Sequence, residues 1–172
     1  MRRSRRIHGS SAAVNVSIPG YKIEHLIAEG GTSSVYLATQ ESLQRHVAIK
    51  LLRKFDKPEQ LIRFLNEGQI IASLNHRNVI NIHDIGVADG GRPYICMEYL
   101  EGGSLKEHLR EKDLSIKEIL DLAIQTGEGL NAAHERGVVH RDIKPDNVML
   151  AEDHALVTDF GVAKAVSEGT GA

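Results

Sequence analysis

Short apolar runs separated by turn residues occupy the first part of the chain. Residues 21–40 contain two runs of strand-forming residues on either side of the turn GGTS at 30–33, and a third run, HVAIKLL, follows at 46–52. Strand-forming runs broken by Gly and Ser are typical of strands joined by hairpins. The pattern therefore predicts an antiparallel meander of three strands.

A helical pattern and two further strand-like runs come next. Pro58 and Glu59 are helix start signals, and apolar residues then recur near helical spacing up to Asn75. The runs VINIHDIG, at 79–86, and RPYICMEYL, at 92–100, flank the turn ADGG. We therefore expect one helix, followed by two more strands that extend the sheet.

The second part of the chain has a mainly helical pattern. The segment EGGSL at 101–105 has the composition of a linker, and Ser115 and Glu118 have the spacing of a capping box. An apolar stripe follows them, up to the helix stop signal Gly137. Strands with one helix, then a Gly-containing joint, then helix predict an α+β chain in two parts.

Composition changes this picture little. The 172 residues carry a formal net charge of -2, and 41% of them are hydrophobic. These values are ordinary for a soluble globular protein and argue against a dedicated nucleic-acid binder. No apolar run has the ~18 residues of a membrane-spanning helix. Cys96 is the single cysteine, so no internal disulfide can form, which favours a cytoplasmic location.

The amino-terminal residues 1–20 differ from the rest of the chain. They include Arg2, Arg3, Arg5 and Arg6, and the long hydrophobic stretch of a signal peptide does not follow them. We interpret this segment as a flexible basic arm.

Two polar motifs near the end of the chain carry the clearest chemistry. Residues 140–147 read HRDIKPDN, and DFG follows at 159–161 after the polar turn AEDH. A tight hairpin of that length folds back on itself, which predicts that Asp159 lies close to Asn147. A carboxylate and an amide oxygen at one point suit Mg²⁺, which also takes phosphate ligands.

The same segment supplies a base and a cation. Asp142 is placed to orient or deprotonate a hydroxyl, and Lys144 can neutralise the charge of a phosphate in transfer. Together with the predicted metal ligands, these residues indicate phosphoryl transfer to an alcohol.

The two motifs together resemble those of the protein kinase family. VAIK at 47–50 also matches a family motif, and the resemblance implies that Lys50 holds the α- and β-phosphates of ATP and pairs with a glutamate of the following helix. Glu67 is the candidate, since it shares a helix face with Ile71. The lysine of HRDIKPDN resembles serine/threonine kinases, and the segments EGGTSSVYLA and YLEGGSL resemble the bacterial members.

The resemblance also implies a nucleotide site. AEGGTSSV at 28–35 would be the loop that covers the phosphates, with Ala28 and Ser33 in place of two family glycines. Backbone groups of Glu98 and Leu100 would bind adenine. The residues expected at ATP are Ala28, Glu29, Gly30, Gly31, Thr32, Ser33, Val35, Ala48, Lys50, Met97, Glu98, Leu100 and Met149.

On this basis the chain divides into the arm at 1–20, an N-terminal lobe at 21–97, a hinge at 98–103 and a partial C-terminal lobe at 104–172. The expected fold is α+β and protein-kinase-like, with an antiparallel sheet and one main helix in the first lobe. No APE motif follows Gly161, so we expect a C-terminally truncated kinase domain. The internal spine of the family would consist of Ile71, Ile82, His140 and Phe160.

The resemblance implies ATP with Mg²⁺ or Mn²⁺ as cofactors, and a protein with a serine or threonine hydroxyl as substrate. A homodimer is compatible with the sequence. Two alternatives stay open. One is an ATP-binding but non-catalytic, pseudokinase-like module, against which the full set of catalytic residues argues. The other is a small-molecule phosphotransferase of kinase-like fold, whose loops resemble HGD rather than HRDIKPDN.

Overall fold

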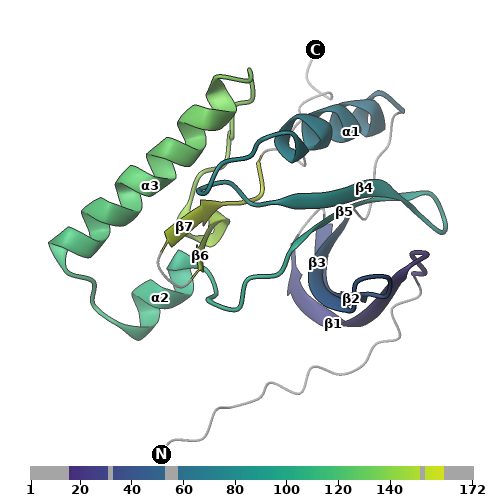
Figure 1. Cartoon of the computed structure of the whole chain (residues 1–172), viewed down its shortest axis with the longest axis horizontal. Coiled ribbons are helices and arrows are strands. Elements are labelled where there is room, and N and C mark those ends of the chain that lie inside the picture. The colour runs from purple at the N-terminus through teal and green to yellow at the C-terminus, as the bar shows by residue number, and fades with distance from the viewer. Residues whose placement is uncertain (1–15, 31–32, 53–57, 152–153, 161–172) are drawn as a thin grey trace, which may run out of the picture.

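Two parts of the chain lie side by side, a curled sheet with one helix and a mainly helical part (Figure 1). This computed structural model describes residues 16–30, 33–52, 58–151 and 154–160, without the side chains of residues 58–60, 63 and 67. Among the described residues, no helix is long and apolar enough to cross a membrane.

The sheet has five antiparallel strands in the order β1-β2-β3-β5-β4. This arrangement confirms the predicted meander and its two-strand extension. The strands are β1 (Tyr21–Glu29), β2 (Ser33–Gln40), β3 (Arg45–Leu52), β4 (Ile82–Ala88) and β5 (Arg92–Glu98).

The run VINIHDIG does not form one strand, contrary to our expectation. Val79 bridges in parallel to Val157, and the Ile80 backbone N–H donates to the Val157 carbonyl at 3.1 Å. The first residues of the run therefore pair with a strand of the second part, and β4 begins only at Ile82. Alternating apolar residues cannot indicate which of two neighbouring strands they will pair with.

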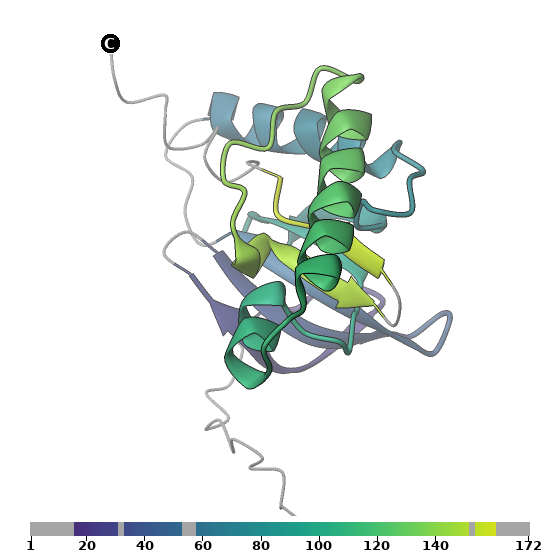
Figure 2. The same cartoon turned by 90° about the vertical axis from the view of Figure 1, so that its left-hand side faces the viewer.

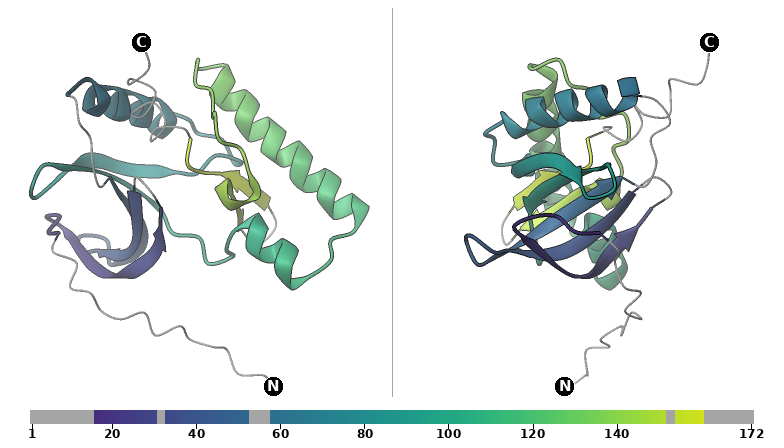
Figure 3. Two further views of the ribbon diagram at one scale, coloured as in Figure 1. Left: turned by 180° about the vertical axis from the view of Figure 1, so that it is seen from behind. Right: turned by 90° about the vertical axis from the view of Figure 1, so that its right-hand side faces the viewer.

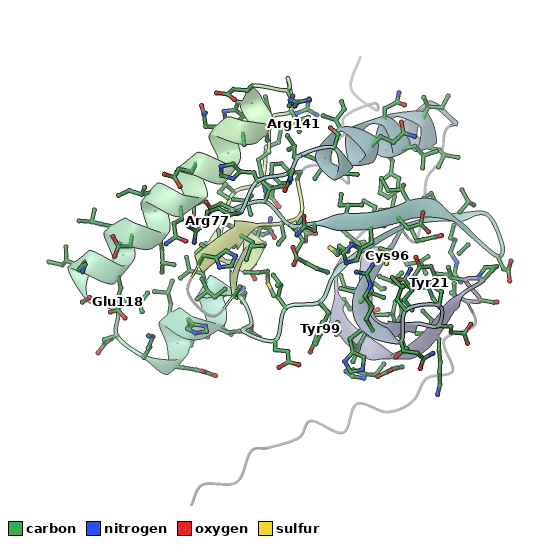
Figure 4. All side chains as sticks on the ribbon, in the orientation of Figure 1. Tyr21, Arg77, Cys96, Tyr99, Glu118 and Arg141 are labelled. Carbon is green, nitrogen blue, oxygen red and sulfur yellow. The ribbon has the colours of Figure 1, made fainter. Side chains whose placement is uncertain are left out.

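The curl of the sheet encloses an apolar core. Cys96 is fully buried there, and Tyr21 reaches from β1 towards it in Figure 4. Burial raises the pKa of the Cys96 thiol, which fits a packing role. Ile18, which we assigned to the flexible arm, is only 3% exposed and belongs to this core. The described packing therefore begins before residue 21.

The second part surrounds a two-stranded ribbon of β6 (Val148–Ala151) and β7 (His154–Val157). The 3₁₀ turn η1 (Pro145–Asn147) leads into the ribbon. The long helix α3 (Ile116–His134) runs beside the ribbon (Figure 2). Helix α2 (Leu105–Glu111) lies near the amino-terminal end of α3. The capping box of Ser115 and Glu118 is present, as predicted.

Helix α2 differs from the prediction, in which EGGSL is a linker and no helix begins at Leu105. Ser104 and Glu107 form a second capping box: the Glu107 carboxylate accepts the Ser104 N–H at 2.8 Å, and the Ser104 hydroxyl accepts the Glu107 N–H. These bonds to Ser104 hold the pKa of Glu107 below its usual value. The same S-x-x-E spacing that identified α3 was available in the sequence at this position.

One apolar core joins the two parts. It contains Phe64 and Ile71 of α1 (Pro58–Ala72), Ile95 of β5, Ala133 of α3 and Val157 of β7. Helix α1 lies along β4 at the top of the molecule, and the view from behind shows the ribbon between the sheet and α3 (Figure 3). The two parts are thus held together by buried apolar surface as well as by the chain.

Truncation of the Phe64 side chain tests this shared core. Phe64 is 1% exposed, so Phe64→Ala should lower the free energy of unfolding by about 3–5 kcal/mol through lost burial and a cavity. Ile62 lies on the same helix but is 57% exposed, and Ile62→Ala should change it by less than about 0.5 kcal/mol. Urea unfolding of both variants measures the difference, and equal losses would contradict this account of the core.

Candidate functional site

The segment HRDIKPDN forms a loop between α3 and β6 and is fixed at its start by a buried histidine. His140 is 2% exposed. Its Nε2 lies 2.8 Å from the Thr158 carbonyl, and its ring centroid lies 4.9 Å from that of Phe160. Burial lowers the pKa of His140, so the ring is neutral at neutral pH and Nε2 is the donor to the carbonyl.

Lys144 and Asn147, the predicted cation and amide of the loop, both donate to Asp142, the predicted base. Lys144 Nζ donates to Asp142 Oδ2 at 3.0 Å. Asn147 Nδ2 donates to the Asp142 carbonyl at 2.8 Å and approaches Oδ2 at 3.5 Å. The hydrogen bond to Asp142 raises the pKa of Lys144. Three of the predicted residues therefore share one point of the loop.

The ribbon returns the chain to this point, as the hairpin argument predicted. Val148 pairs with Val157 in the ribbon, and the Thr158 N–H donates to the Asn147 carbonyl at 2.9 Å. Asp159 follows directly, with a φ of 56°. Left-handed backbone is rare for a residue other than glycine and is characteristic of functional sites. The two predicted metal ligands thus come from neighbouring ends of one ribbon.

A buried lysine of the sheet reaches the same place. Lys50 of β3 is 7% exposed, and its Nζ donates to Asp159 Oδ1 at 2.7 Å. This ion pair spans the two parts of the molecule. Glu67 lies on α1, but its side chain is outside the described residues, so its pairing with Lys50 stays a prediction.

The donor set fits a hard cation. Asn147 Nδ2 is committed to Asp142, which leaves Oδ1 as the atom of this amide suited to a metal. Asp159 supplies carboxylate oxygens from the residue after Thr158, whose N–H bonds the Asn147 carbonyl. Among the described residues no group of three or more His, Cys, Asp or Glu side chains could hold a metal. One amide and one carboxylate match the way Mg²⁺ is bound together with phosphates.

A cavity lies between the sheet, helix α1 and the residues that follow β7, next to the ion pair of Lys50 and Asp159. Ile80 and Ile95 line it but were not predicted as site residues; the apolar runs at 79–86 and 92–98 were the available signal. The other lining residues all have predicted roles: Lys50, Ile71, Ile82, Met97, Asp159 and Phe160.

The residues predicted to enclose adenine lie close to this cavity. Ala48 of β3 pairs with Met97 of β5, and both belong to a small apolar cluster that includes Val35 and Leu100. Met149 of β6 bridges to Ser104 just after the hinge. The sheet, hinge and ribbon thus bring together residues that are far apart in the sequence.

The predicted phosphate-covering loop is the turn between β1 and β2. Its ends are joined by a hydrogen bond from the Gly30 N–H to the Ser33 carbonyl at 2.9 Å. Ala28 and Glu29 lie on β1, where Ala28 pairs with Val35 of β2. Gly31 and Thr32 lie outside the described residues.

The predicted hinge at 98–103 ends against the ribbon. The Glu98 N–H donates to the Asn81 carbonyl at 3.0 Å, which ties the start of the hinge to the chain before β4. At its end, the Leu150 N–H donates to the Gly103 carbonyl at 2.9 Å. A Cβ on Gly102 would lie 2.0 Å from the Leu150 carbonyl oxygen, so only glycine fits this close approach.

One ion pair at the edge of the loop was not predicted. Lys106 of α2 donates to Asp146, the residue before Asn147, at 2.5 Å. This hydrogen bond holds the pKa of Asp146 below its usual value. Both side chains are exposed, so the pair adds little stability. Lys106 lies on α2, a helix absent from the predicted elements.

Comparison with known proteins gives a consistent result. Residues 21–171 match the family model described as protein kinase domain. The chain is 45% identical over 154 residues to a probable serine/threonine-protein kinase of Clostridium acetobutylicum, and 38% identical over 165 residues to the serine/threonine-protein kinase PknA of Mycobacterium tuberculosis. The alignments cover 87% and 91% of this chain but 23% and 38% of the two relatives. The chain therefore spans well under half the length of these relatives.

The buried His140 predicts a dependence of stability on pH. The pKa of His140 is lowered by folding, so below about 6.5 the unfolded chain binds a proton that the folded chain excludes. Stability should therefore fall as the pH falls through that value. His83 shifts in the same direction, so the test is the difference between the wild-type chain and His140→Phe.

Urea unfolding at pH 7.5 and pH 5.5 makes this measurement. His140→Phe keeps a ring against Phe160 but cannot titrate, so it should lose less stability between the two pH values than the wild-type chain. It should also be less stable at pH 7.5, since the bond to the Thr158 carbonyl is lost. An unchanged difference between the two pH values would contradict the role given to His140.

Proposed function

Because the chain belongs to the protein kinase family, we propose that it forms the nucleotide-binding and catalytic part of a serine/threonine protein kinase. The proposed reaction transfers the γ-phosphate of ATP to a serine or threonine hydroxyl of a protein, with Mg²⁺. The observation that carries the proposal is the convergence of Lys50, Asp142, Asn147 and Asp159 from three segments of the chain: strand β3, the loop HRDIKPDN and the residues after β7.

Each of these groups has a chemical task in the proposed reaction. Asp142 accepts the proton of the serine or threonine hydroxyl. The hydroxyl oxygen bonds to the γ-phosphorus of ATP while the bond from that phosphorus to the β-phosphate oxygen breaks, and ADP leaves. Lys144 Nζ, at 3.0 Å from the same carboxylate, donates a hydrogen bond to it and offers positive charge to the phosphate. In this pair, Asp142 therefore acts on the attacking hydroxyl and Lys144 on the transferred phosphate.

The remaining groups hold the nucleotide. Asn147 and Asp159 would hold Mg²⁺, which neutralises phosphate charge when it is bound. Lys50 is buried in the sheet beside Asp159, where its ammonium group can bind phosphate oxygens. Val35, Ala48, Met97 and Met149 would enclose the adenine ring, with backbone groups of Glu98 and Leu100 at its edge.

The names of the relatives favour a protein hydroxyl as the acceptor. The similar proteins of Clostridium acetobutylicum and Mycobacterium tuberculosis are described as serine/threonine-protein kinases. The loop lysine Lys144 bonded to Asp142 agrees with that class.

Asp142→Asn separates binding from transfer. The variant keeps the shape of the side chain and its place beside Asn147 but cannot take a proton. We expect phosphate transfer from ATP to a generic basic protein to fall by about 10²–10⁴-fold, with little change in the affinity for Mg·ATP in calorimetry. Mg·ATP binding without transfer by the wild-type chain would support the non-catalytic module instead.

Asp159→Asn tests the metal ligand. Calorimetry with ATP in excess Mg²⁺ and in EDTA gives the part of the affinity that depends on the metal. Loss of the carboxylate should reduce the metal-dependent part by about 10-fold or more, because one hard oxygen ligand becomes neutral. Lys112→Gln serves as a control, since Lys112 lies after α2 and contacts Glu118. Identical metal dependence in wild-type chain and Asp159→Asn would contradict the assignment.

A further inference from the structure

The loop between α1 and β4 carries a buried asparagine that holds strand β7. Asn78 is 0% exposed. Its Nδ2 donates to the Ala155 carbonyl at 2.7 Å, and its own carbonyl accepts the Val157 N–H at 2.9 Å. With the bond from the Ile80 N–H to the Val157 carbonyl at 3.1 Å, the loop acts as a short parallel strand on the outer edge of the ribbon.

The side chain of Asn78 adds one hydrogen bond to β7 beyond the backbone bonds at Val157. Its amide N–H reaches the Ala155 carbonyl two residues before Val157, and Ala155 itself is fully buried. Without Asn78, this carbonyl would lose a donor in a place that water does not reach. The amide therefore substitutes for a missing backbone donor on the edge of β7.

The orientation of the amide is fixed by its neighbours. Gln125 Oε1 of α3 accepts the Ala155 N–H at 2.7 Å and lies 3.4 Å from Asn78 Nδ2. A flipped Asn78 would direct Oδ1 at two acceptors, the Ala155 carbonyl and Gln125 Oε1, which repel it. The donor atom therefore points at β7, and Gln125 joins the same network from α3.

This orientation has a cost at the other end of the amide. Among the residues that the structure describes, Asn78 Oδ1 is the one buried side-chain polar atom without a hydrogen-bond partner. A buried polar atom without a partner is unfavourable, and an apolar side chain of similar volume would avoid it. An apolar side chain would, however, leave the buried Ala155 carbonyl without its donor, so the asparagine is explained by the bond that it donates to β7.

The helix on the other side fixes the loop in place. A Cβ on Gly129 of α3 would lie 2.3 Å from the Asn78 carbonyl oxygen. The loop is therefore confined between α3 and β7 with little room to shift. A small displacement of the loop would be transmitted to β7 rather than absorbed by a gap.

Strand β7 leads directly to the residues that would hold the metal. Thr158, the residue after Val157, donates through its N–H to the Asn147 carbonyl and accepts from His140 through its own carbonyl. Asp159 follows and pairs with Lys50. The register of β7 therefore decides where the Asp159 carboxylate stands relative to the Asn147 amide.

We infer that Asn78 is a positioning residue for Asp159 and Asn147, acting through the outer edge of β7. The inference rests on the proposed function in that it takes this pair as the Mg²⁺ ligands. It places Asn78, on the loop after α1, among the residues that set the metal geometry.

Asn78→Leu removes the donor while keeping the volume. In the 172-residue chain, calorimetry should show the affinity for ATP in excess Mg²⁺ reduced by about 10-fold and the affinity in EDTA changed by less than about 2-fold. A role in packing alone would lower both affinities together. Equal losses in Mg²⁺ and in EDTA, or no loss in a folded variant, would overturn the inference.

Gln125 provides a second pair of variants with less risk to folding, because its side chain is only half-buried. Gln125→Glu keeps an acceptor for the Ala155 N–H and should retain the metal-dependent affinity. Gln125→Leu removes the acceptor for the Ala155 N–H, and we expect this variant to lose part of the metal-dependent affinity for ATP. Asn131→Leu is the matched control on α3, since the Asn131 amide bonds the exposed Glu135 and not β7. If Gln125→Leu behaved like this control, the inference would fail.

Hydrogen exchange without ligand separates this inference from the proposed function. Asn78→Leu should speed the exchange of the Val157 and Thr158 amides, while those of β2 and β3 stay as in the wild-type chain. Unchanged exchange at Thr158 would overturn the inference even if the wild-type chain binds Mg·ATP. If the wild-type chain binds no Mg·ATP, the proposed function fails, and the exchange result decides whether Asn78 positions β7.

Discussion

The hydrogen bond from the Thr158 N–H to the Asn147 carbonyl is the contact on which the candidate site depends. It closes the ribbon of β6 and β7 and brings an amide from before one strand next to a carboxylate from after the other. Because the two strands are antiparallel and only four residues long, their ends cannot separate without loss of the whole ribbon. Small ribbons are not stable alone, so their edges need support.

Both edges of this ribbon are supported by segments that begin or end in the sheet. The end of the hinge pairs with β6 through Gly103 and Ser104, and the loop after α1 pairs with β7 through Asn78 and Val79. The segment before β4 and the segment after β5 therefore fix the two edges of the same ribbon. The shared core around Phe64 and Val157 adds apolar burial to these bonds. This arrangement explains how two parts with separate secondary structure present one site.

The ion pair of Lys50 and Asp159 is the polar counterpart of that core. A lysine at 7% exposure in a sheet is costly unless an opposite charge lies within reach. Asp159 supplies that charge at 2.7 Å, from a residue with left-handed backbone. Both the buried charge and the unusual backbone are unfavourable locally, and both are retained at the site where a phosphate and a metal are expected.

Much of the site could be predicted from the sequence because its signals are local. The spacing within HRDIKPDN fixes how Asp142, Lys144 and Asn147 meet, and a short hairpin fixes the return of Asp159. The capping box at Ser115 was predicted, and the second capping box, at Ser104, was not. Both depend on hydrogen bonds within one helical turn. The burial of Ile18 was not visible, since it depends on a sheet that curls over it.

The amino-acid sequence by itself determined the order of the strands and helices and the types of group in the site, because periodicity, caps and turns act between near neighbours. The tertiary structure decided which strand a run pairs with and which side chain is buried. The division of VINIHDIG between β7 and β4, the place of Asn78 and the contact of Lys50 with Asp159 all join residues distant in sequence. Such contacts depend on the packing of several elements at once, which no local pattern encodes.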